Sequence, residues 1–575
     1  MLTTSGSVLT AVSEGNADIN VTAKHLGKTY ETSSSVTVKN LDYDISPSRT
    51  ATGIVIARKT DSIEVGEEFS CQAYILSDMT DEHPYPYGYA DDNLVKFTSN
   101  NPNVCRVKNG VLLGVAPGTA TITASDLDGT VSDSFDVSVI EPTKLEYTED
   151  QVLNVDATAY DWSTDESTTL AIQNILAEAS AAGMRKVVFP NQIYEVSPAY
   201  GTILIPTQMI VDFSGSVIQI QPSALTSTGY VMFDIVDCEY STLTNAIIYG
   251  EIDLIDGSGA EGCESVRVQG NSYRSGFENC TLSKSPGFNA YSKNTNRKVV
   301  GVSYSSVTAG GIDDTGTEIE QAYAYRSGYT SVKNVGNANN QLWLGNVQGF
   351  GGYLYLSARV FDIHWYDTNK VHIGVEHNCV QYYAYTKPDG AVYARIVFWQ
   401  ASAPTSGDPD YHAIAHLHSY DKPERCYFRN CRFEDSISTG LVANGGEGLL
   451  IENCVFHNNG YRDPHAAIDW EDGRQHAKGH ILRNCTFSGN GGDVTVIGAD
   501  GLVVHNNVFD SIKLDIRDEV QNSRVWLNTF IKDGLKIKPK TDAVVSQNVF
   551  WDGAECNIVS IEDVNFAVRE TENQF

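Results

Sequence analysis

The stretch from Glu424 to Phe550 decides the fold, because it repeats one five-residue phrase six times. The copies are Arg-Asn-Cys-Arg-Phe (429–433), Glu-Asn-Cys-Val-Phe (452–456), Arg-Asn-Cys-Thr-Phe (483–487), His-Asn-Asn-Val-Phe (505–509), Trp-Leu-Asn-Thr-Phe (526–530) and Ser-Gln-Asn-Val-Phe (546–550). Their final phenylalanines are 23, 31, 22, 21 and 20 residues apart. A period just above twenty, with short β-rich segments and Gly, Asn or Asp turns, indicates a solenoid of stacked coils. The Leu-x-x-Leu-x-Leu frame of leucine-rich repeats is missing, so we expect a parallel β-helix with coils about 4.8 Å apart.

The repeated phrase also predicts two columns of side chains inside the coils. The six phenylalanines would form one aromatic stack. Two residues before them stand Cys431, Cys454, Cys485, Asn507, Asn528 and Asn548. Thiols are small, polarizable core groups, and inward asparagines can bond the coils above and below in a ladder. The interior therefore needs no cofactor.

Composition and charge restrict the class of protein. The chain has 575 residues, too many for one ordinary domain, and 48 glycines and 30 tyrosines suit a β-rich protein. No run of eighteen apolar residues predicts a transmembrane helix, and Met1–Ser7 lacks the basic and apolar regions of a signal peptide. The net charge of −32 argues against nucleic acid and anionic membrane as partners, and it would repel a polyanion unless a local basic patch exists. Eleven cysteines without a Cys-x-x-Cys pair indicate reduced thiols in a protein folded in a cytosol.

The N-terminal part contains an imperfect duplication. Residues 8–21 align with residues 111–124 at a shift of 103. The later copy contains Ser-Asn-Asn-Pro-Asn-Val (99–104) and the Gly-Val-Leu-Leu-Gly-Val-Ala-Pro-Gly-Thr phrase that starts at Gly110, and it resembles the bacterial Ig-like domain of group 2, a β-sandwich. The resemblance implies a complete domain over 46–142 and only the C-terminal part of another over 1–45, as if the chain began inside a larger protein. Such domains are usually spacers or adhesive modules.

A second resemblance covers the start of the coils. Asn154–Gln173, a helix expected over about 167–182, and Gly183–Pro190 resemble the opening of the pectate-lyase-3-like β-helix family, found in phage tailspikes and polysaccharide-cleaving enzymes. The usual Gly-Asp-Gly-x-x-Asp-Asp is replaced by Tyr-Asp-Trp-Ser-Thr-Asp-Glu at 160–166, and we expect these acidic residues to be structural. The helix would cover the exposed edge of the first coil.

The coil phrases stop between residues 318 and 402, which are rich in Tyr and Trp. This segment resembles the small β-sandwich inserted in many phage tail proteins, which is similar to carbohydrate-binding modules. Trp343, Trp365 and Trp399 would either stack on sugar rings or form the core of the sandwich. The expected fold is therefore all-β, a right-handed parallel β-helix with an N-terminal Ig-like β-sandwich and an inserted carbohydrate-binding-like β-sandwich. The expected β-helix parts are 143–317 and 403–552, and 553–575 would be a C-terminal cap or tail.

The long step between Phe456 and Phe487 marks a candidate site. The strand Ala467-Ile-Asp-Trp-Glu471 lies there between two loops. If Ile468 and Trp470 point inward, Asp469 and Glu471 point outward, roughly 6.6 Å apart along the strand. Two carboxylates at such spacing suit glycosidic cleavage, one as acid and one as base or nucleophile. The alternative is that they brace the following turn.

Alignment of neighbouring coils adds further candidates to this face. Asp469 should lie beside Val442 and Thr495, and Glu471 beside Asn444. His416 and His418, expected one coil earlier, would join the catalytic groups through acid–base work. The candidate substrate-binding residues are Asn444, Arg462, His465, Trp470, Arg474 and His476. No metal site and no cofactor are assigned; no motif indicates a Ca²⁺ ion.

Together the resemblances imply a phage or prophage tail-associated protein that binds, and in one reading cleaves, a bacterial surface polysaccharide. They also imply a homotrimer, other tail proteins as partners, and a place in the virion tail after assembly in the host cytoplasm. A non-catalytic receptor-binding fibre is the first alternative. A secreted, extracellular pectate-lyase-like enzyme is the second, disfavoured by the missing signal peptide and by the lack of an evident Arg- and Asp-rich calcium site. Neither nucleic acid nor membrane insertion is expected.

Overall fold

The computed structural model describes most of the chain. The described residues are 51–77, 95–126, 128–222, 229–250, 262–337, 339–345, 360–380, 383–400, 403, 413–460, 465–471, 477–517, 520, 522–537, 543–558 and 568–571. For strands 2–5, 8–11, 15–25, 28–38 and 568–571, and for residues 77, 557 and 558, only the backbone is described.

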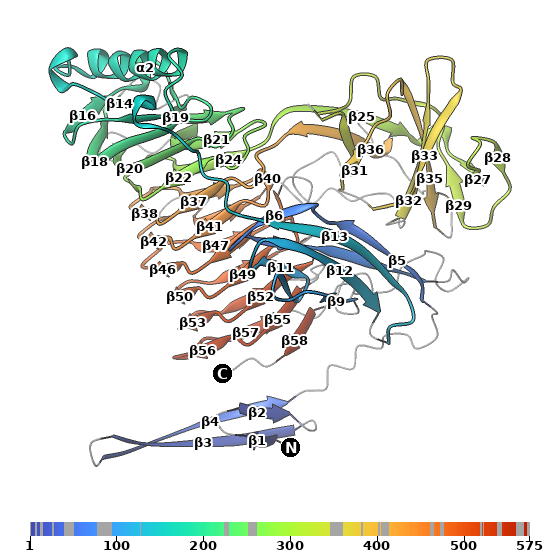
Figure 1. Ribbon diagram of the computed structural model, residues 1–575. Helices are drawn as coiled ribbons and strands as arrows, with labels where there is room; N and C mark the ends of the chain where they lie inside the picture. The colour runs from blue at the N-terminus through green and yellow to red at the C-terminus, as the bar shows by residue number, and fades with distance from the viewer. Residues whose placement is uncertain are drawn as a thin grey trace.

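Three parallel sheets wind into one stack of coils, so the predicted all-β parallel β-helix is confirmed (Figure 1). The 20-stranded sheet contains β14 (Val152–Asn154), β15 (Lys186–Val188), β16 (Ile193–Val196), β18 (Ile210–Ile220), β20 (Thr242–Tyr249), β22 (Gly276–Glu278), β23 (Thr281–Ser283), β37 (Tyr427–Arg429), β38 (Arg432–Glu434), β41 (Leu450–Glu452), β42 (Val455–His457), β45 (Ile481–Arg483), β46 (Thr486–Ser488), β49 (Val503–His505), β50 (Val508–Asp510), β52 (Ser523–Trp526), β53 (Thr529–Ile531), β55 (Ala543–Ser546), β56 (Val549–Trp551) and β58 (Val568–Thr571). The 10-stranded sheet contains β17 (Ile203–Leu204), β19 (Tyr230–Val236), β21 (Cys263–Gln269), β24 (Phe288–Lys293), β39 (Thr439–Ala443), β43 (Ala466–Trp470), β47 (Asp493–Val496), β51 (Leu514–Ile516), β54 (Leu535–Ile537) and β57 (Cys556–Ile558). The third sheet contains β40 (Gly446–Glu447), β44 (Ala477–Lys478) and β48 (Ala499–Asp500). Strands β57 and β58 continue the coils beyond residue 552, where we expected a cap or tail.

In the coils that carry the repeated phrase, a left-handed residue bends the chain between the two strands of the 20-stranded sheet. The residue just before the Cys or Asn column has a φ of 52–56° in Asn430, Asn453, Asn484 and Asn506. Asparagine adopts this conformation more readily than most residues, because its short side chain bonds locally. This explains why the repeated phrase carries Asn at that position.

The predicted phenylalanine column is confirmed. Phe433, Phe456, Phe487, Phe509, Phe530 and Phe550 pair coil to coil, with ring centroids 4.6–5.0 Å apart and planes within 10° of parallel. The rings are at most 5% exposed. The spacing equals the distance between strands in a sheet, so each ring covers the one in the next coil.

The second interior column is also as predicted. Cys431, Cys454 and Cys485 are buried free thiols, and each places its Sγ against backbone carbonyls of its own coil and the preceding one. Below them the column continues as an asparagine ladder, in which Asn507 donates to Asn528 and Asn528 donates to Asn548, both at 3.0 Å.

One helix covers the first coils, at the end of the stack opposite to β56 (Figure 1). Helix α2 (Asp165–Ala181) begins after Thr164, whose side chain accepts from the backbone N–H of Ser167. Its buried face, which includes Ile172, Ile175 and Leu176, joins the main core. The short 3-10 helices are η1 (Glu149–Gln151), η2 (Ala157–Ala159), η3 (Pro198–Tyr200) and η7 (Tyr304–Ser306).

The insert is a sandwich of two antiparallel sheets, and it is wider than the predicted range 318–402. One sheet contains β25 (Thr295–Ser303), β36 (Ala413–Asp421), β31 (Gln341–Gly345) and β34 (Tyr385–Thr386). The other contains β26 (Thr308–Ala309), β29 (Ala324–Arg326), β35 (Tyr393–Trp399), β32 (Val360–Tyr366), β33 (His372–Val380) and β30 (Thr330–Ser331), beside a hairpin of β27 (Gly311–Ile312) and β28 (Glu318–Ile319). Trp365 lies in the core between the sheets, whereas Trp343 and Trp399 are not part of that core.

The described residues within 51–140 form a separate apolar core enclosed by small sheets, here called the N-terminal domain. Its strands are β5 (Ala51–Arg58), β6 (Ser62–Glu64), β7 (Glu68–Ser70), β8 (Gln72–Ser77), β9 (Val95–Ser99), β10 (Cys105–Lys108), β11 (Val111–Gly114), β12 (Gly118–Asp126) and β13 (Ser132–Ile140). The preceding strands are β1 (Leu2–Ser5), β2 (Val8–Ala11), β3 (Gly15–His25) and β4 (Lys28–Val38). At the predicted shift of 103, β1 and β2 coincide with β10 and β11 and have the same antiparallel register.

The N-terminal domain lies along the coils rather than apart from them (Figure 1). Glu67 contacts both Arg274 and Arg425, at 3.0 and 3.1 Å. Glu68 contacts Arg483 and His505, at 3.2 and 2.8 Å. An apolar cluster seals the contact, made of Val111 with the outward coil residues Leu450, Ile481, Val503 and Trp526. The domain is therefore a lateral brace on the coils, not the spacer that we expected.

Candidate functional site

The candidate site is a row of outward side chains on the 10-stranded sheet. Parallel pairing aligns one position from coil to coil, in the order Asp234, Arg267, Tyr291, Val442, Asp469, Thr495, Asp515 and Lys536. The flanking residues of each strand, such as Ile468 and Trp470, are in the core. Because side chains alternate along a strand, the row faces away from that core. The predicted placement of Asp469 between Val442 and Thr495 is confirmed.

Two carboxylates at the upper end of this face share one arginine. Asp234 Oδ2 accepts from Arg267 at 2.7 Å and from Gln269 at 2.7 Å. Glu264 Oε2 lies 3.3 Å from Arg267 as an ion pair that is not aligned as a hydrogen bond. The carboxylates are buried, with 3% and 6% exposure.

Burial sets the protonation of this pair. It raises the pKa of Glu264 to about 7, against the opposing charges of Arg267 and Lys293. Burial also raises the pKa of Asp234, although the hydrogen bonds from Arg267 and Gln269 oppose it. A carboxyl group with a pKa near neutrality beside a second carboxylate is the arrangement used for general acid–base work. The sequence analysis did not find Asp234 and Glu264, because the repeated phrase does not extend to their strands. A single acidic residue within an otherwise apolar strand is the sequence feature that could have indicated them.

Asp469 is the buried centre of the lower part of the row, with 3% exposure. Two coils further along, Asp515 accepts from Arg517 at 2.9 Å. The register therefore places Asp234 at the first position of the row and two carboxylates in its lower part, with Thr495 between Asp469 and Asp515.

Glu471 and Asn444 meet just after the C-terminal ends of their strands, β43 and β39. The backbone N–H of Glu471 donates to Asn444 Oδ1 at 2.7 Å, so the expected proximity of these two residues is found. Trp470 between the carboxylates is fully buried, and its indole N–H donates to His480 Nδ1 at 2.9 Å. Trp470 anchors the strand inside the core, and this position does not fit the sugar-contacting role that we predicted for it.

His416 and His418 are not on a coil. Both lie on β36, which pairs antiparallel with β25 and β31 of the insert, so the expected position one coil before Asp469 is wrong. A strand of a coil and a strand of a sandwich can show the same alternation of apolar and polar residues. The sequence pattern around His416 and His418 therefore could not distinguish the two. The ring of His418 stacks on Tyr420, and Tyr420 stacks on Trp343, with centroids 6.0 and 5.0 Å apart.

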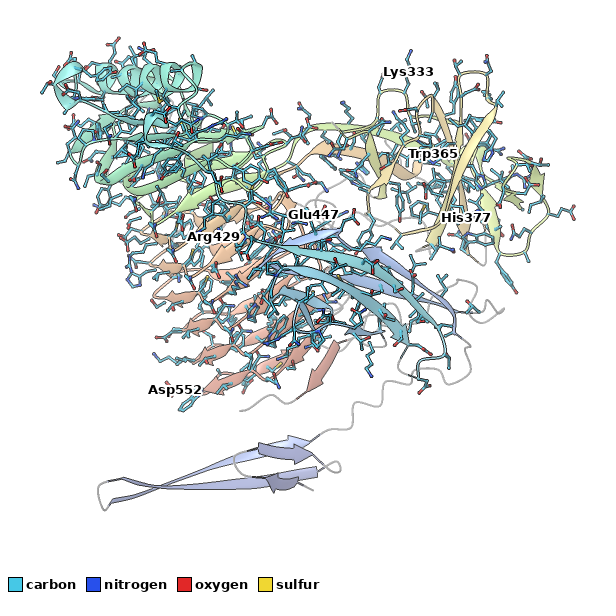
Figure 2. The ribbon with its side chains drawn as sticks, viewed as in Figure 1. Lys333, Trp365, His377, Arg429, Glu447 and Asp552 are labelled. Carbon is cyan, nitrogen blue, oxygen red and sulfur yellow. The ribbon has the colours of Figure 1, made fainter. Side chains whose placement is uncertain are left out.

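Lys478 of β44 faces this aromatic group where the insert meets the coils. Its Nζ lies 5.6 Å from the ring centre of Trp343 and 5.1 Å from that of Tyr383. Burial lowers the pKa of Lys478 to about 7. On the neighbouring coil Glu447 is paired with Arg58 and Lys422, and Figure 2 shows it where the coils meet the N-terminal domain.

The remaining predicted residues belong to the loops on either side of β43. Arg462, Arg474 and His476 lie outside the described residues. His465 is described and exposed, with a φ of 48°. Across the described part of the chain, no group of three or more His, Cys, Asp or Glu side chains is arranged to hold a metal ion. Nor do the described residues include a helix long and apolar enough to cross a membrane.

Comparison with known proteins agrees with the coil architecture. A family profile described as "Right handed beta helix region" matches residues 414–573. No curated protein sequence is significantly similar to the chain.

Solved structures share the general fold at low identity. ORF18 of Geobacillus virus E2 is 11% identical, with a TM-score of 0.40, over 74% of this chain and 62% of that chain. The A-module of the mannuronan C-5 epimerase AlgE4 from Azotobacter vinelandii is 11% identical, with a TM-score of 0.37, over 73% of this chain and 95% of that chain. The Dettilon tailspike protein gp208 is 12% identical, with a TM-score of 0.32, over 71% and 68% of the two chains. The present chain thus spans less than two thirds of the virus E2 protein, and these similarities concern the fold alone.

Proposed function

We propose that the chain is a phage or prophage tail-associated protein whose coils recognise a bacterial surface polysaccharide. The observation that carries this proposal is the outward row of the 10-stranded sheet, whose positions recur at about 4.8 Å from coil to coil. All of its side chains except Val442 can form hydrogen bonds, and Arg267, Tyr291 and Lys536 are partly exposed. A polysaccharide is itself a linear series of polar units, so a regular row of hydrogen-bonding groups can contact several sugars at once. The sequence resemblances of residues 154–190 and of the insert support the phage-tail setting.

Cleavage of the bound polysaccharide is a second candidate function, favoured by the carboxylates on the same face. Glu264 would be the acid, because its raised pKa keeps it protonated up to about pH 7. Asp234, held by Arg267, would be the base or nucleophile. Asp469 and Glu471 remain the alternative pair, proposed from their outward positions. A binding-only fibre is the reading that applies if neither pair cleaves.

The test uses the whole protein and a panel of purified bacterial surface polysaccharides. Binding is measured by calorimetry, and cleavage by new reducing ends and by the absorbance of unsaturated sugars. Lys536→Met alters the row, whereas Lys513→Met alters an exposed lysine outside it and serves as the matched control. We expect Lys536→Met to lower affinity several-fold and Lys513→Met to leave it unchanged. If the two variants bind with equal affinity, the outward row of the 10-stranded sheet is not the polysaccharide-binding surface.

The same panel separates the two carboxylate pairs. If Glu264 is the acid, Glu264→Gln abolishes cleavage while binding persists, and wild-type activity declines as the pH rises through about 7. If Glu264→Gln retains cleavage activity, Glu264 is not the acid. If the wild-type protein binds a polysaccharide but does not cleave it, the protein is a binding-only fibre.

Assembly belongs to the same proposal. A homotrimer with coils side by side, bound to other tail proteins, would use a side of the stack other than the one occupied by the N-terminal domain. Sedimentation of the full chain measures this directly. A secreted, extracellular pectate-lyase-like polysaccharide-degrading enzyme is the remaining alternative.

A further inference from the structure

The outer face of one insert sheet carries a compact group of cations and tyrosines. On β32 the residues Phe361, Ile363 and Trp365 point into the sandwich core, and on β35 Ala394 and Ile396 do the same. The intervening side chains therefore point to the opposite face of the sheet. Figure 2 shows this part of the insert, with Trp365 and His377 labelled. The side chains that meet on this outer face are Arg326, Arg395, Lys370, Tyr329 and Tyr393.

Two arginines on this face hold one carboxylate. Glu318 Oε2 lies 2.8 Å from Arg326, and Glu318 Oε1 lies 2.7 Å from Arg395. Arg395 also donates from Nε to the carbonyl of Ser327 at 2.9 Å, which fixes the direction of its guanidinium. The arginine side chains are 14% and 7% exposed, but Glu318 is 50% exposed. The carboxylate therefore closes, from the solvent side, a site whose cations are already in place.

Glu318 lies on a two-residue edge strand at the surface of the insert. Its strand β28 has two residues, both exposed, and pairs only with the two residues of β27 among the described strands. Arg395 belongs instead to the central strand of the same outer sheet, paired on both sides. Segments with few buried contacts open at low free-energy cost, whereas central strands stay closed.

An aromatic ring adjoins the two arginines. Tyr329 is 40% exposed, and its ring centre lies 5.0 Å from the guanidinium of Arg395 and 4.7 Å from Lys370 Nζ. Lys370 also lies 5.7 Å from the ring centre of Tyr393. An exposed tyrosine offers an apolar face on which a sugar ring can stack, and the adjacent cations can bind an anionic substituent.

We infer that this group is a binding site for a carboxylate-bearing sugar, and that Glu318 occupies its anion position in the free protein. Paired guanidinium groups bind carboxylates through parallel charge-assisted hydrogen bonds, which Glu318 now makes. A chain with a net charge of −32 repels an acidic polysaccharide unless cations are concentrated locally, and Arg326, Arg395 and Lys370 supply that concentration. This inference rests on the proposed polysaccharide recognition and names its substrate class.

The test measures acidic sugars on full-length Glu318→Gln. The probes are D-glucuronate, D-galacturonate and N-acetylneuraminate, with D-glucose and D-galactose as neutral counterparts and D-glucose 6-phosphate as a phosphate. Removing the internal carboxylate raises the fraction of open sites, so at least one acidic sugar should bind roughly tenfold tighter than to wild type, by calorimetry at low salt. Neutral sugars should show no such gain. Glu320→Gln is the matched control, because it removes the same charge two residues away from an exposed position.

A second variant protects the inference from an effect on folding. Lys370 is exposed, so Lys370→Gln should fold normally, and in the Glu318→Gln background it should weaken acidic-sugar binding several-fold. The assignment is overturned if no acidic sugar gains affinity, if Glu320→Gln gains as much, or if the phosphate binds better than every carboxylate. Suppose that Lys536→Met weakens polysaccharide binding but Glu318→Gln binds no acidic sugar. This result would disprove only the site on the insert and would leave the proposed function standing.

Discussion

The backbone N–H of Cys485 donates a hydrogen bond of 2.8 Å to Oδ1 of Asn507, one coil further along the stack. At this point the interior column changes from thiols to amides. Above it, the N–H of Cys454 donates to the sulfur of Cys485 at 3.4 Å, and below it Asn507 donates to Asn528 at 3.0 Å. A carboxamide both accepts and donates, so in the lower coils this column continues as amide-to-amide hydrogen bonds from one coil to the next.

Asn528 should be the most costly residue of this ladder to remove. Its Oδ1 accepts from the backbone and side chain of Asn507, and its Nδ2 donates to the carbonyl of Val504. Asn528→Ala leaves these buried groups without partners and should lower the free energy of unfolding by about 2–4 kcal/mol. Urea denaturation measures the loss. Asn528→Cys, which matches the upper coils, should lose less; an alanine variant as stable as wild type would show that water replaces the amide.

Leu527 is expected to be a destabilising residue. It has a φ of 55° and is 45% exposed, at the position where Asn430, Asn453, Asn484 and Asn506 stand in other coils. Leu527→Asn should therefore raise the free energy of unfolding by about 1 kcal/mol, because asparagine tolerates the left-handed region better. Trp551→Asn is the control, since it also removes an exposed apolar side chain, but outside that region. An equal gain from both would assign the effect to surface hydrophobicity rather than to the backbone.

Lys478 should make stability depend on pH. Its folded pKa of about 7 lies below the ordinary 10.5, so above pH 7 the folded chain binds fewer protons than the unfolded chain. Burying the charged lysine lowers the free energy of unfolding by its full amount below pH 7. This loss becomes smaller as the pH rises toward 10.5, because the folded lysine is then neutral. Lys478→Met should thus be more stable than wild type at pH 6, by a margin that shrinks above pH 7 by at most about 1.4 kcal/mol per pH unit. Lys333→Met controls for the loss of one exposed positive charge. If the stability difference between Lys478→Met and wild type does not change with pH, the side chain of Lys478 is solvated rather than buried.

Asp469 and Glu471 give a prediction that separates chemistry from structure. Asp469→Asn or Glu471→Gln should preserve folding and lower cleavage by about two to four orders of magnitude if the pair is catalytic, because each amide removes an acid or base with little change in shape. Reducing-end release and thermal melting are measured together. A lower melting temperature with unchanged sugar binding and cleavage would identify the pair as a brace of the turn.

The cysteines should react in a defined order. All eleven cysteines are reduced thiols; ten are buried, whereas Cys556 is only partly buried. Burial raises the pKa of Cys431 and Cys454 well above its usual value, so they should resist alkylation in the native protein. We expect Cys556 to be modified first and eleven thiols to titrate after denaturation without reductant. Fewer titrating thiols would reveal a disulfide.

The repeated phrase was sufficient to predict the coils, because every copy shows the same interior position as Phe and four of the six show the bend as Asn. It was therefore also sufficient to place Asp469 beside Val442 and Thr495. The sequence could not place His416, since β36 has the alternation of a coil strand but pairs with β25, more than a hundred residues earlier. Contacts such as Glu67 with Arg425 were equally invisible, because ion pairs between distant segments leave no periodic trace.

The position of the N-terminal domain has a consequence for how the molecule comes apart. A free solenoid opens from either end, one coil at a time, because each coil contacts only its neighbours. Here Glu67, Glu68 and Val111 join coils from Arg274 to Trp526, so those coils are splinted and must separate together. Among the described residues, the strands after Trp526 have fewer such attachments, such as the hydrogen bond from Lys108 to Gln547 at 3.0 Å, so unravelling from this end should begin at β58 and stop at the splint.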